Sequence, residues 1–272
     1  MKNLEGTVAV LAGGTFRRWP RDRKRAGLPL AFCHLINNSN DSVVIIILTS
    51  GPRAPTLEHM SDSPVNLWGN ELHAVQYLNR ADTIPHRSEG EAALLEWVPR
   101  RLARVLDLGS GDGRLLSVVT QACAPSEAVA LDFSETMLER LRNRFAANPG
   151  IRVLAHDLDF PLPSDLGTFD AIVSSFAIHH LAHPRKRALY EEIFARLRPG
   201  AVFCNLEHVA SPTLALHRKF LATLDFQPED EDPSNKLLDV QTQLDWLREI
   251  GFGDVDCHWK WRELALLVGT RT

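Results

Sequence analysis

Short apolar runs alternate with longer stretches whose hydrophobic residues recur every three or four positions. This pattern predicts strands separated by amphipathic helices. The expected strands are residues 104–108, 128–132, 151–155, 169–174 and 201–206, and the expected helices are residues 113–123, 134–147 and 184–197. Apolar strands joined by helices form a parallel sheet that helices cover on both faces, so the pattern predicts an α/β fold.

Two further helices are expected before the first of these strands. Residues 66–79 carry leucine and valine at helical spacing. Ser88 and Glu91 stand at the spacing of a capping box, in which each side chain satisfies a backbone amide of the other residue. We therefore expect a helix that begins at Ser88 and turns Leu94, Leu95 and Val98 toward the core.

Residues 1–59 do not share this pattern. They hold eight Lys or Arg and four Asp or Glu, whereas the rest of the chain holds 22 and 30, so a basic segment precedes an acidic body. Its one apolar run, residues 43–48, is far shorter than the roughly 20 residues of a membrane span. The run also begins too late for a signal peptide. We expect residues 1–59 to be a weakly ordered basic extension and residues 60–272 to form one domain.

Composition narrows the classes of function. The chain has 272 residues, of which 44% are hydrophobic and 24% charged, so it can bury a substantial core. Its net charge of −4 offers no general attraction for nucleic acid or anionic lipid. Cys33, Cys123, Cys204 and Cys257 are far apart and form neither a C-x-x-C pair nor a metal-ligand pattern. They predict reduced thiols in a cytoplasmic compartment and no metal site.

The strongest chemical signal is Val-Leu-Asp-Leu-Gly-Ser-Gly-Asp-Gly at residues 105–113, which leaves a strand and opens a helix. Glycines at such a junction let a ligand approach the backbone closely. Arg114 stands where a dinucleotide-binding fingerprint needs its third glycine, and the Gly-Lys-Ser/Thr of a Walker loop is absent. Asp107 would repel a pyrophosphate and attract a cation, so the segment favours a cationic nucleoside.

Acidic residues also follow the next two expected strands. Asp132 ends the second strand, where a carboxylate can accept hydrogen bonds from both ribose hydroxyls. Asp157, after the third strand, can accept a hydrogen bond from an adenine amino group, and Phe133, Met137 and Leu158 can enclose the adenine ring. Because the carboxyl ends of parallel strands meet at one edge of the sheet, these residues are expected to lie together with Asp107.

Five segments in order make residues 103–206 resemble the class I S-adenosylmethionine-dependent methyltransferases, specifically the small-molecule group with a methyltransferase-25-like core. The segments are VLDLGSGDGRLL, ALDFSETMLERLR, AHDLDFPLP, FDAIVSSFAIHHL and LRPGAVF. The resemblance implies a Rossmann-like, mostly parallel sheet of seven strands with helices on both faces and an antiparallel C-terminal hairpin near residues 255 and 264–268. It implies N-terminal cap helices at residues 60–100, a cofactor-binding core at 103–208, and a substrate insert with the hairpin at 209–272.

The same resemblance assigns residues to the cofactor S-adenosylmethionine. Asp107, Gly109 and Gly111 would line its methionine moiety, and Ser175 would meet its amino-acid end. Arg87 would pair with its carboxylate, unless it is a solvated loop charge. The residues expected to bind S-adenosylmethionine are Tyr77, Arg87, Asp107, Gly109, Gly111, Asp132, Phe133, Met137, Asp157, Leu158 and Ser175.

Methyl transfer is an in-line displacement in which alignment supplies much of the rate. A base is needed only if the acceptor must lose a proton. His179 and His180, just after the fourth strand, and Glu207 with His208 at the end of the fifth, are the candidates. A histidine in the loop after the fourth strand can equally serve only to pack on the adenosine, and the sequence leaves both roles open.

The sequence says less about the molecule that accepts the methyl group. No Asn/Asp-Pro-Pro-aromatic element follows the fourth strand and no Pro-Cys pair occurs, so methylation of nucleic acid is disfavoured. The substrate pocket is expected to involve residues 209–237, with the acidic run at 229–232 a solvated loop. We expect a methyltransferase that acts on a small molecule, as a monomer or homodimer, without a nucleic-acid or membrane partner. The alternative is a non-catalytic module that binds S-adenosylmethionine, and the acceptor and the methylated atom stay open.

Overall fold

The computed structural model describes residues 10–12, 15–17, 36–38, 41–43 and 83–272. The chain divides into two units, residues 1–62 and 63–272. In the first unit, β1 (Val10–Ala12) pairs antiparallel with β2 (Thr15–Arg17), and β3 (Ile36–Asn38) pairs antiparallel with β4 (Asp41–Val43). The sequence pattern does not predict these short strands. The helix expected at residues 66–79 lies outside the described residues.

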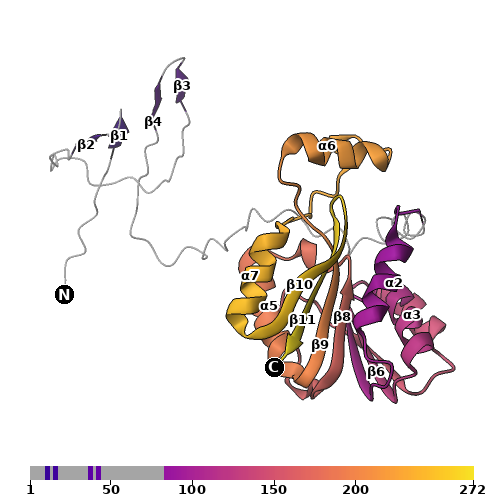
Figure 1. Ribbon diagram of the computed structural model, residues 1–272. Coiled ribbons are helices and arrows are strands. Elements are labelled where there is room, and N and C mark those ends of the chain that lie inside the picture. The colour runs from indigo at the N-terminus through magenta and orange to yellow at the C-terminus, as the bar shows by residue number, and fades with distance from the viewer. Residues whose placement is uncertain (1–9, 13–14, 18–35, 39–40, 44–82) are drawn as a thin grey trace, which may run out of the picture. The chain divides into compact units, whose positions relative to one another are not determined.

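The second unit is built on a seven-stranded sheet with the order β10-β11-β9-β8-β5-β6-β7 (Figure 1). Its parallel strands are β5 (Arg104–Leu108), β6 (Glu127–Asp132), β7 (Ile151–Ala155), β8 (Phe169–Ser175) and β9 (Leu197–His208). β10 (Phe252–Trp261) and β11 (Leu264–Arg271) form an antiparallel hairpin, and β11 pairs antiparallel with β9. The Rossmann-like, mostly parallel sheet with a C-terminal hairpin is therefore confirmed.

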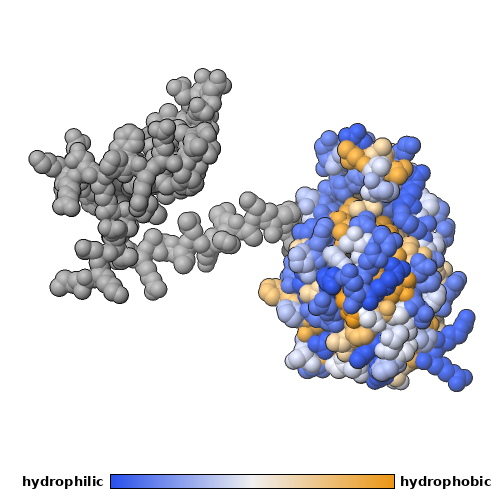
Figure 2. All heavy atoms as spheres, turned by 60° about the vertical axis from the view of Figure 1, so that its left-hand side comes forward, coloured by the Kyte–Doolittle hydropathy of each residue, from blue (hydrophilic) through white to orange (hydrophobic). Residues whose placement is uncertain are grey.

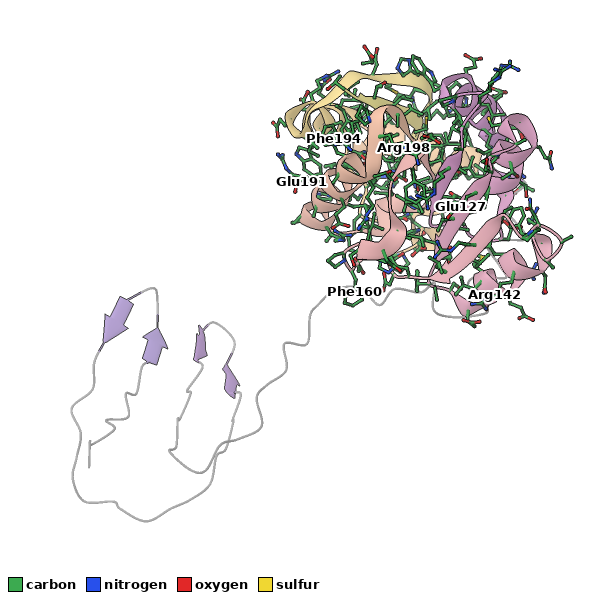
Figure 3. All side chains as sticks on the ribbon, turned by 90° about the horizontal axis from the view of Figure 1, so that it is seen from below. Glu127, Arg142, Phe160, Glu191, Phe194 and Arg198 are labelled. Atoms are coloured by element: carbon green, nitrogen blue, oxygen red, sulfur yellow. The ribbon has the colours of Figure 1, made fainter. Side chains whose placement is uncertain are left out.

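Helices cover both faces of this sheet. α2 (Arg87–Trp97), α3 (Arg114–Cys123) and α4 (Glu135–Arg144) pack on one face, and α5 (His183–Arg196) and α7 (Val240–Ile250) pack on the other. Short 3-10 turns form η2 (Ser164–Leu166), η3 (Ile178–His180) and η4 (Pro228–Asp230). Polar residues such as Arg142 of α4 and Glu191 of α5 are exposed on the outer sides of these helices (Figure 3).

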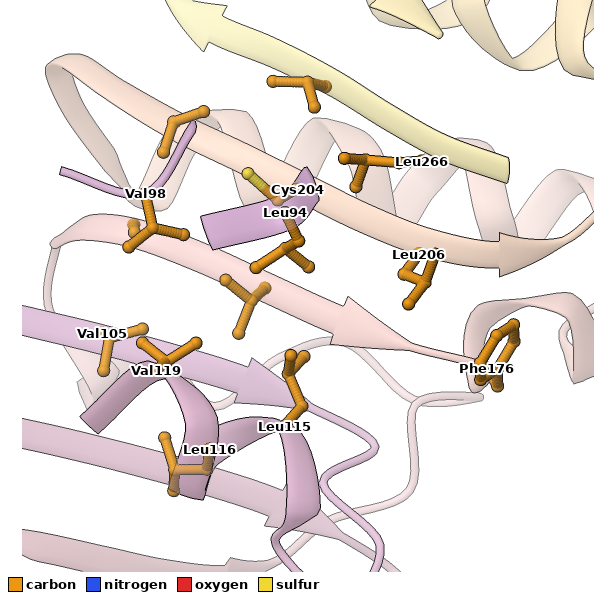
Figure 4. Close-up of a cluster of buried hydrophobic side chains, with 14 of the residues drawn as sticks. Leu94, Val98, Val105, Leu115, Leu116, Val119, Phe176, Cys204, Leu206 and Leu266 are labelled. Atoms are coloured by element: carbon orange, nitrogen blue, oxygen red, sulfur yellow. The ribbon is translucent and has the colours of Figure 1, made fainter. Parts of the chain in front are cut away.

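The strands supply two cores because successive residues of a strand point to opposite faces. Val105 of β5 enters the core beneath α2 and α3, where Leu94 and Leu116 pack (Figure 4). Its neighbour Leu106 enters the core beneath α5, beside Tyr190. This two-sided packing fixes the carboxyl ends of β5, β6 and β8 at one edge of the sheet, where the site described below begins.

The insert after β9 carries α6 (Leu214–Thr223). Leu214 and Leu216 of this helix are 63% and 46% exposed, and Figure 2 shows hydrophobic residues at the surface there. No described helix has the length and apolar character that crossing a membrane requires.

The capping box predicted at Ser88 and Glu91 is wrong. The N-cap of α2 is His86, whose backbone is left-handed with φ 60° and whose side chain makes no capping hydrogen bond. The Oε1 atom of Glu91 instead accepts hydrogen bonds from Nε of Arg87 at 3.1 Å and Nε of Arg114 at 2.7 Å. Charge-assisted bonds to two guanidinium groups are stronger than a bond to one backbone amide, so Glu91 turns away from the helix start.

We expect Leu116→Ala to lower the free energy of unfolding by about 2–5 kcal/mol, because the side chain is fully buried and its loss leaves a cavity. Urea unfolding followed by circular dichroism measures the change. Leu216→Ala removes the same atoms from an exposed position and should change the free energy of unfolding by less than about 0.5 kcal/mol. Equal effects of the two substitutions would contradict the assignment of the core.

Candidate active site

A cleft lies at the carboxyl ends of β5, β6 and β8. Its walls come from the turn after β5, the loops after β6, β7 and β8, and the start of α2. Ten of the residues predicted to bind the cofactor line it: Arg87, Asp107, Gly109, Gly111, Asp132, Phe133, Met137, Asp157, Leu158 and Ser175. The eleventh, Tyr77, lies outside the described residues. The structure thus brings these ten together, and their individual roles in binding stay predictions.

The turn after β5 contains three glycines with positive φ, and two of them, Gly109 and Gly111, line the cleft. Gly109 has φ 66°, and a Cβ atom there would lie 2.2 Å from Cβ of Ala177 in the loop after β8. Gly111 has φ 56°, and a Cβ atom there would meet nothing within 4 Å. A side chain at Gly109 would therefore push the two loops apart, whereas at Gly111 the backbone itself forms the open wall of the cleft, which a ligand can approach closely.

Asp132 holds this turn in place. Its carboxylate is 9% exposed and accepts hydrogen bonds from the backbone N–H of Gly111 at 2.8 Å and of Ser134 at 2.9 Å. Burial raises the pKa of Asp132, and the backbone amides partly oppose that rise. The sequence points to Asp132 as a ribose ligand but not as an anchor of the turn. Each carboxylate oxygen can accept more than one hydrogen bond, so both roles are compatible.

Asp107 is the most unusual group in the cleft. It is fully buried, and neither carboxylate oxygen has a hydrogen-bond partner among the described residues. Burial raises the pKa of Asp107 to about 7. A buried carboxylate without a partner is costly, and a ligand that brings a positive group to it would offset that cost. The buried carboxyl group of Asp107 therefore fits a cationic ligand such as a sulfonium nucleoside.

The other walls differ in polarity. Met137 and Leu158 are buried and Phe133 is 36% exposed, so together they offer an apolar surface of the kind that suits a nucleobase. The hydroxyl oxygen of Ser175 is buried with no hydrogen-bond partner in the described part of the chain. Arg87 is 7% exposed and its guanidinium lies over the ring of Phe176, with 5.4 Å to the centroid. Arg87 is thus a buried charge and not a solvated one.

The predicted histidines occupy different depths. His180 lines the cleft, whereas His179 and His208 do not. The ring of His179 lies 3.9 Å from that of His180 and 5.5 Å from that of His208, measured between centroids. Nδ1 of His179 lies 2.7 Å from Oε1 of Glu207, which is 1% exposed. Of these three predicted histidines, only His180 is therefore placed to meet a ligand in the cleft directly.

Burial sets the protonation of this cluster. It lowers the pKa of His179 and that of His180 well below the usual value for histidine, so both rings are neutral near pH 7. Burial also raises the pKa of Glu207, an effect that Lys186 partly opposes. A neutral imidazole can accept a proton, which a histidinium cannot.

The insert contributes polar residues that the sequence did not reveal. Oγ of Ser234 lies 2.9 Å from Nδ1 of His180. The acidic run was expected to be a solvated loop, which is wrong for two of its members. Oε2 of Glu231 lies 3.1 Å from Nε2 of His217, and Oδ1 of Asp232 accepts a hydrogen bond from the Ser234 hydroxyl at 2.7 Å. Ser234 and His180 are 54 residues apart and Glu231 and His217 are 14 apart, so no local motif marks these two contacts.

Comparison with known proteins gives consistent results. A methyltransferase domain model matches residues 105–200. Demethylmenaquinone methyltransferase of Clavibacter sepedonicus is 31% identical over 168 residues, which are 56% of this chain and 66% of that protein. Chloroplastic 2-methyl-6-phytyl-1,4-hydroquinone methyltransferase 2 of Oryza sativa subsp. japonica is 30% identical over 156 residues, which are 57% of this chain and 40% of that protein. The match thus spans less than two thirds of the length of either relative.

Solved structures share the fold. An O-methyltransferase family protein from Burkholderia thailandensis superposes with a TM-score of 0.60 at 17% sequence identity. The match covers 75% of this chain and 61% of that chain.

The raised pKa of Asp107 makes stability depend on pH. Between the ordinary pKa of about 3.8 and the folded value of about 7, the folded chain holds a proton on Asp107 that the unfolded chain has lost. Stability from this group is present below pH 4 and is lost as the pH rises to 7, by at most on the order of 4 kcal/mol. Asp107→Asn should remove this loss, as urea unfolding at a series of pH values would reveal.

The matched control is Asp165→Asn, which changes an exposed aspartate of η2. It should leave the pH dependence as it is in the unaltered chain. A parallel loss of stability with pH in Asp107→Asn and the unaltered chain would contradict the buried, unpartnered state of Asp107.

Proposed function

The chain belongs to the class I S-adenosylmethionine-dependent methyltransferases, whose cofactor is S-adenosylmethionine, and from this membership we propose that it methylates a small molecule with an ionisable hydroxyl group, of the hydroquinone or phenol class. The observation that carries the proposal is His180, a neutral histidine on the wall of the same cleft as Asp107 and Ser175. The quinone-related names of the two relatives support this choice of acceptor class.

The cleft residues fit the cofactor. Asp107 supplies the negative charge for its cationic end, and Asp132 has acceptor capacity left for the ribose hydroxyls. Phe133, Met137 and Leu158 supply the apolar surface for the adenine. When bound, S-adenosylmethionine supplies a methyl group that its positive sulfur makes electrophilic. The protein's part is to align this group with the acceptor and to exclude water from the cleft.

The acceptor of this class has to lose a proton to become a good nucleophile, and His180 is in position to take it. Burial keeps its ring neutral, so it can accept a proton at neutral pH. His179 lies against the same ring and is itself bonded to Glu207. Glu207 behind His179 and Asp232 beside Ser234 favour the positive charge that His180 gains on proton transfer, whereas His179 itself opposes it.

A non-catalytic binding module is the competing function. Such a module needs the cofactor residues and could use His180 to pack on the adenosine, but it does not need the carboxylate and second histidine that lie behind that ring. The extended polar cluster of His179, His180 and Glu207 therefore favours an enzyme. The two functions differ in one measurable property, the release of S-adenosylhomocysteine.

Calorimetric titration with S-adenosylmethionine tests the cofactor site. Asp132→Asn should weaken binding by about 1–3 kcal/mol, or roughly 5- to 150-fold in Kd, because one acceptor for the ribose hydroxyls is lost and the turn is held less firmly. Glu135→Gln, an exposed change three residues along the chain, serves as the control and should bind as the unaltered chain does. Unchanged affinity in Asp132→Asn would reject its assignment to the ribose.

Turnover tests the reaction itself. With S-adenosylmethionine and a panel of hydroquinones and phenols, the unaltered chain should release S-adenosylhomocysteine. His180→Gln should lower kcat by about a hundredfold, the range typical of a lost general base. His183→Gln alters an exposed histidine three residues away and should retain full activity. Binding of the cofactor without turnover across the panel would support the non-catalytic module instead.

A further inference from the structure

The turn that carries His180 follows β8 in the chain and is also hydrogen-bonded to the insert. The backbone N–H of Lys236 donates to the carbonyl oxygen of His179 at 2.9 Å, and Nζ of Lys236 donates to the carbonyl oxygen of His180 at 2.7 Å. Lys186 of α5 is 1% exposed and donates from Nζ to the carbonyl oxygens of His179, at 3.2 Å, and of Lys236. Residues 232–236 and η3 therefore form one hydrogen-bonded unit.

Within this unit, the hydroxyl of Ser234 lies between two polar groups. The residue is 1% exposed, and its Oγ lies 2.7 Å from Oδ1 of Asp232 and 2.9 Å from Nδ1 of His180. The backbone N–H of Ser234 donates to the same Asp232 oxygen at 2.8 Å, which fixes the two residues relative to each other.

The chemistry of these groups decides where the protons lie. An ionised carboxylate only accepts hydrogen bonds, so the single hydrogen of the Ser234 hydroxyl points to Asp232. The Ser234 oxygen then has only acceptor capacity left for His180, so Nδ1 of His180 carries a proton. A neutral imidazole has one N–H, and Nε2 of His180 therefore holds the lone pair.

We propose that Ser234, oriented by Asp232, is a positioning residue that fixes the tautomer of His180 and so makes Nε2 the ring nitrogen that can accept a proton. The catalytic consequence rests on the proposed function, whereas the tautomer is a property of the chain alone. In the reaction, the O–H bond of the acceptor breaks, an N–H bond forms at Nε2, and the electron pair stays on the acceptor oxygen. The Nδ1–H of the resulting imidazolium keeps its hydrogen bond to Ser234.

Nitrogen-15 NMR of the full chain tests the tautomer directly, since protonated and lone-pair nitrogens of a neutral imidazole differ in chemical shift. The His180→Gln spectrum identifies the His180 signals among those of the 11 histidines. The unaltered chain should have the proton on Nδ1. Ser234→Ala should move the population toward the form with the proton on Nε2, because the acceptor that holds the Nδ1 proton is lost.

Matched variants separate positioning from general damage. Ser234→Thr keeps a hydroxyl and should keep the Nδ1–H form. If Ser234→Ala fails to fold, Ser234→Cys takes its place, because it also removes the strong acceptor but has nearly the volume of serine. Thr242→Val removes another hydroxyl that donates to an aspartate at 2.7 Å, at the start of α7, and should leave the His180 signals unchanged. A proton on Nε2 in the unaltered chain, or identical His180 spectra in Ser234→Ala, would overturn the proposal.

Kinetics provide the second readout. If the chain methylates its acceptor, Ser234→Ala should lower kcat at least tenfold while changing KM for the acceptor by less than about twofold, and Ser234→Thr should restore most of kcat. Loss of kcat in Ser234→Ala without rescue by Ser234→Thr counts against the positioning role. Should no acceptor be methylated, the proposed function fails, and the NMR result alone still decides the assignment of Ser234.

Discussion

A buried carboxylate without a hydrogen-bond partner, that of Asp107, is the constraint around which the cofactor side of the cleft is arranged. The turn that follows has amides nearby but directs them elsewhere. The N–H of Ser110 donates to the carbonyl oxygen of Leu131 and that of Gly111 to Asp132. These bonds join the ends of β5 and β6 and leave the carboxyl group of Asp107 without a hydrogen-bond partner among the described residues. The turn is thus stabilised by the neighbouring strand. The carboxyl group of Asp107 stays available to a cationic ligand.

The two sides of the site are built by different means. The cofactor side consists mostly of backbone and of residues that directly follow strands, so the sheet determines its geometry. The acceptor side consists of side chains from η3, the end of β9 and the insert, joined by hydrogen bonds between histidines, carboxylates and Ser234. Strand ends are fixed by a large hydrophobic core, whereas such a polar cluster is fixed only by its own partners, which must all be present.

This difference explains what the sequence could predict. The strands and helices of residues 104–206 follow from hydrophobic periodicity, and the cofactor residues lie in short consecutive motifs such as residues 105–113. The prediction of a capping box is wrong because Glu91 accepts a hydrogen bond from Arg114, which is 23 residues away. Local spacing does not reveal this pairing. For the same reason the contact between His180 and Ser234, 54 residues apart, is invisible until the fold brings η3 and the insert together.

The burial of Glu263 shows how firmly the insert is fixed. This carboxylate, between β10 and β11, has no exposed surface, and burial alone would raise its pKa. Hydrogen bonds from His208, Ser211 and His217 outweigh that effect and lower the pKa. Because these donors come from the end of β9, the loop after it and α6, moving the insert would strip a buried charge of its partners, which is strongly unfavourable. The hydrogen bonds that stabilise the buried charge of Glu263 therefore also hold the insert, which includes Ser234, in one arrangement before any ligand binds. A proton acceptor oriented in advance loses no free energy to reorganisation during the reaction, which is the advantage that a preorganised polar site has over water.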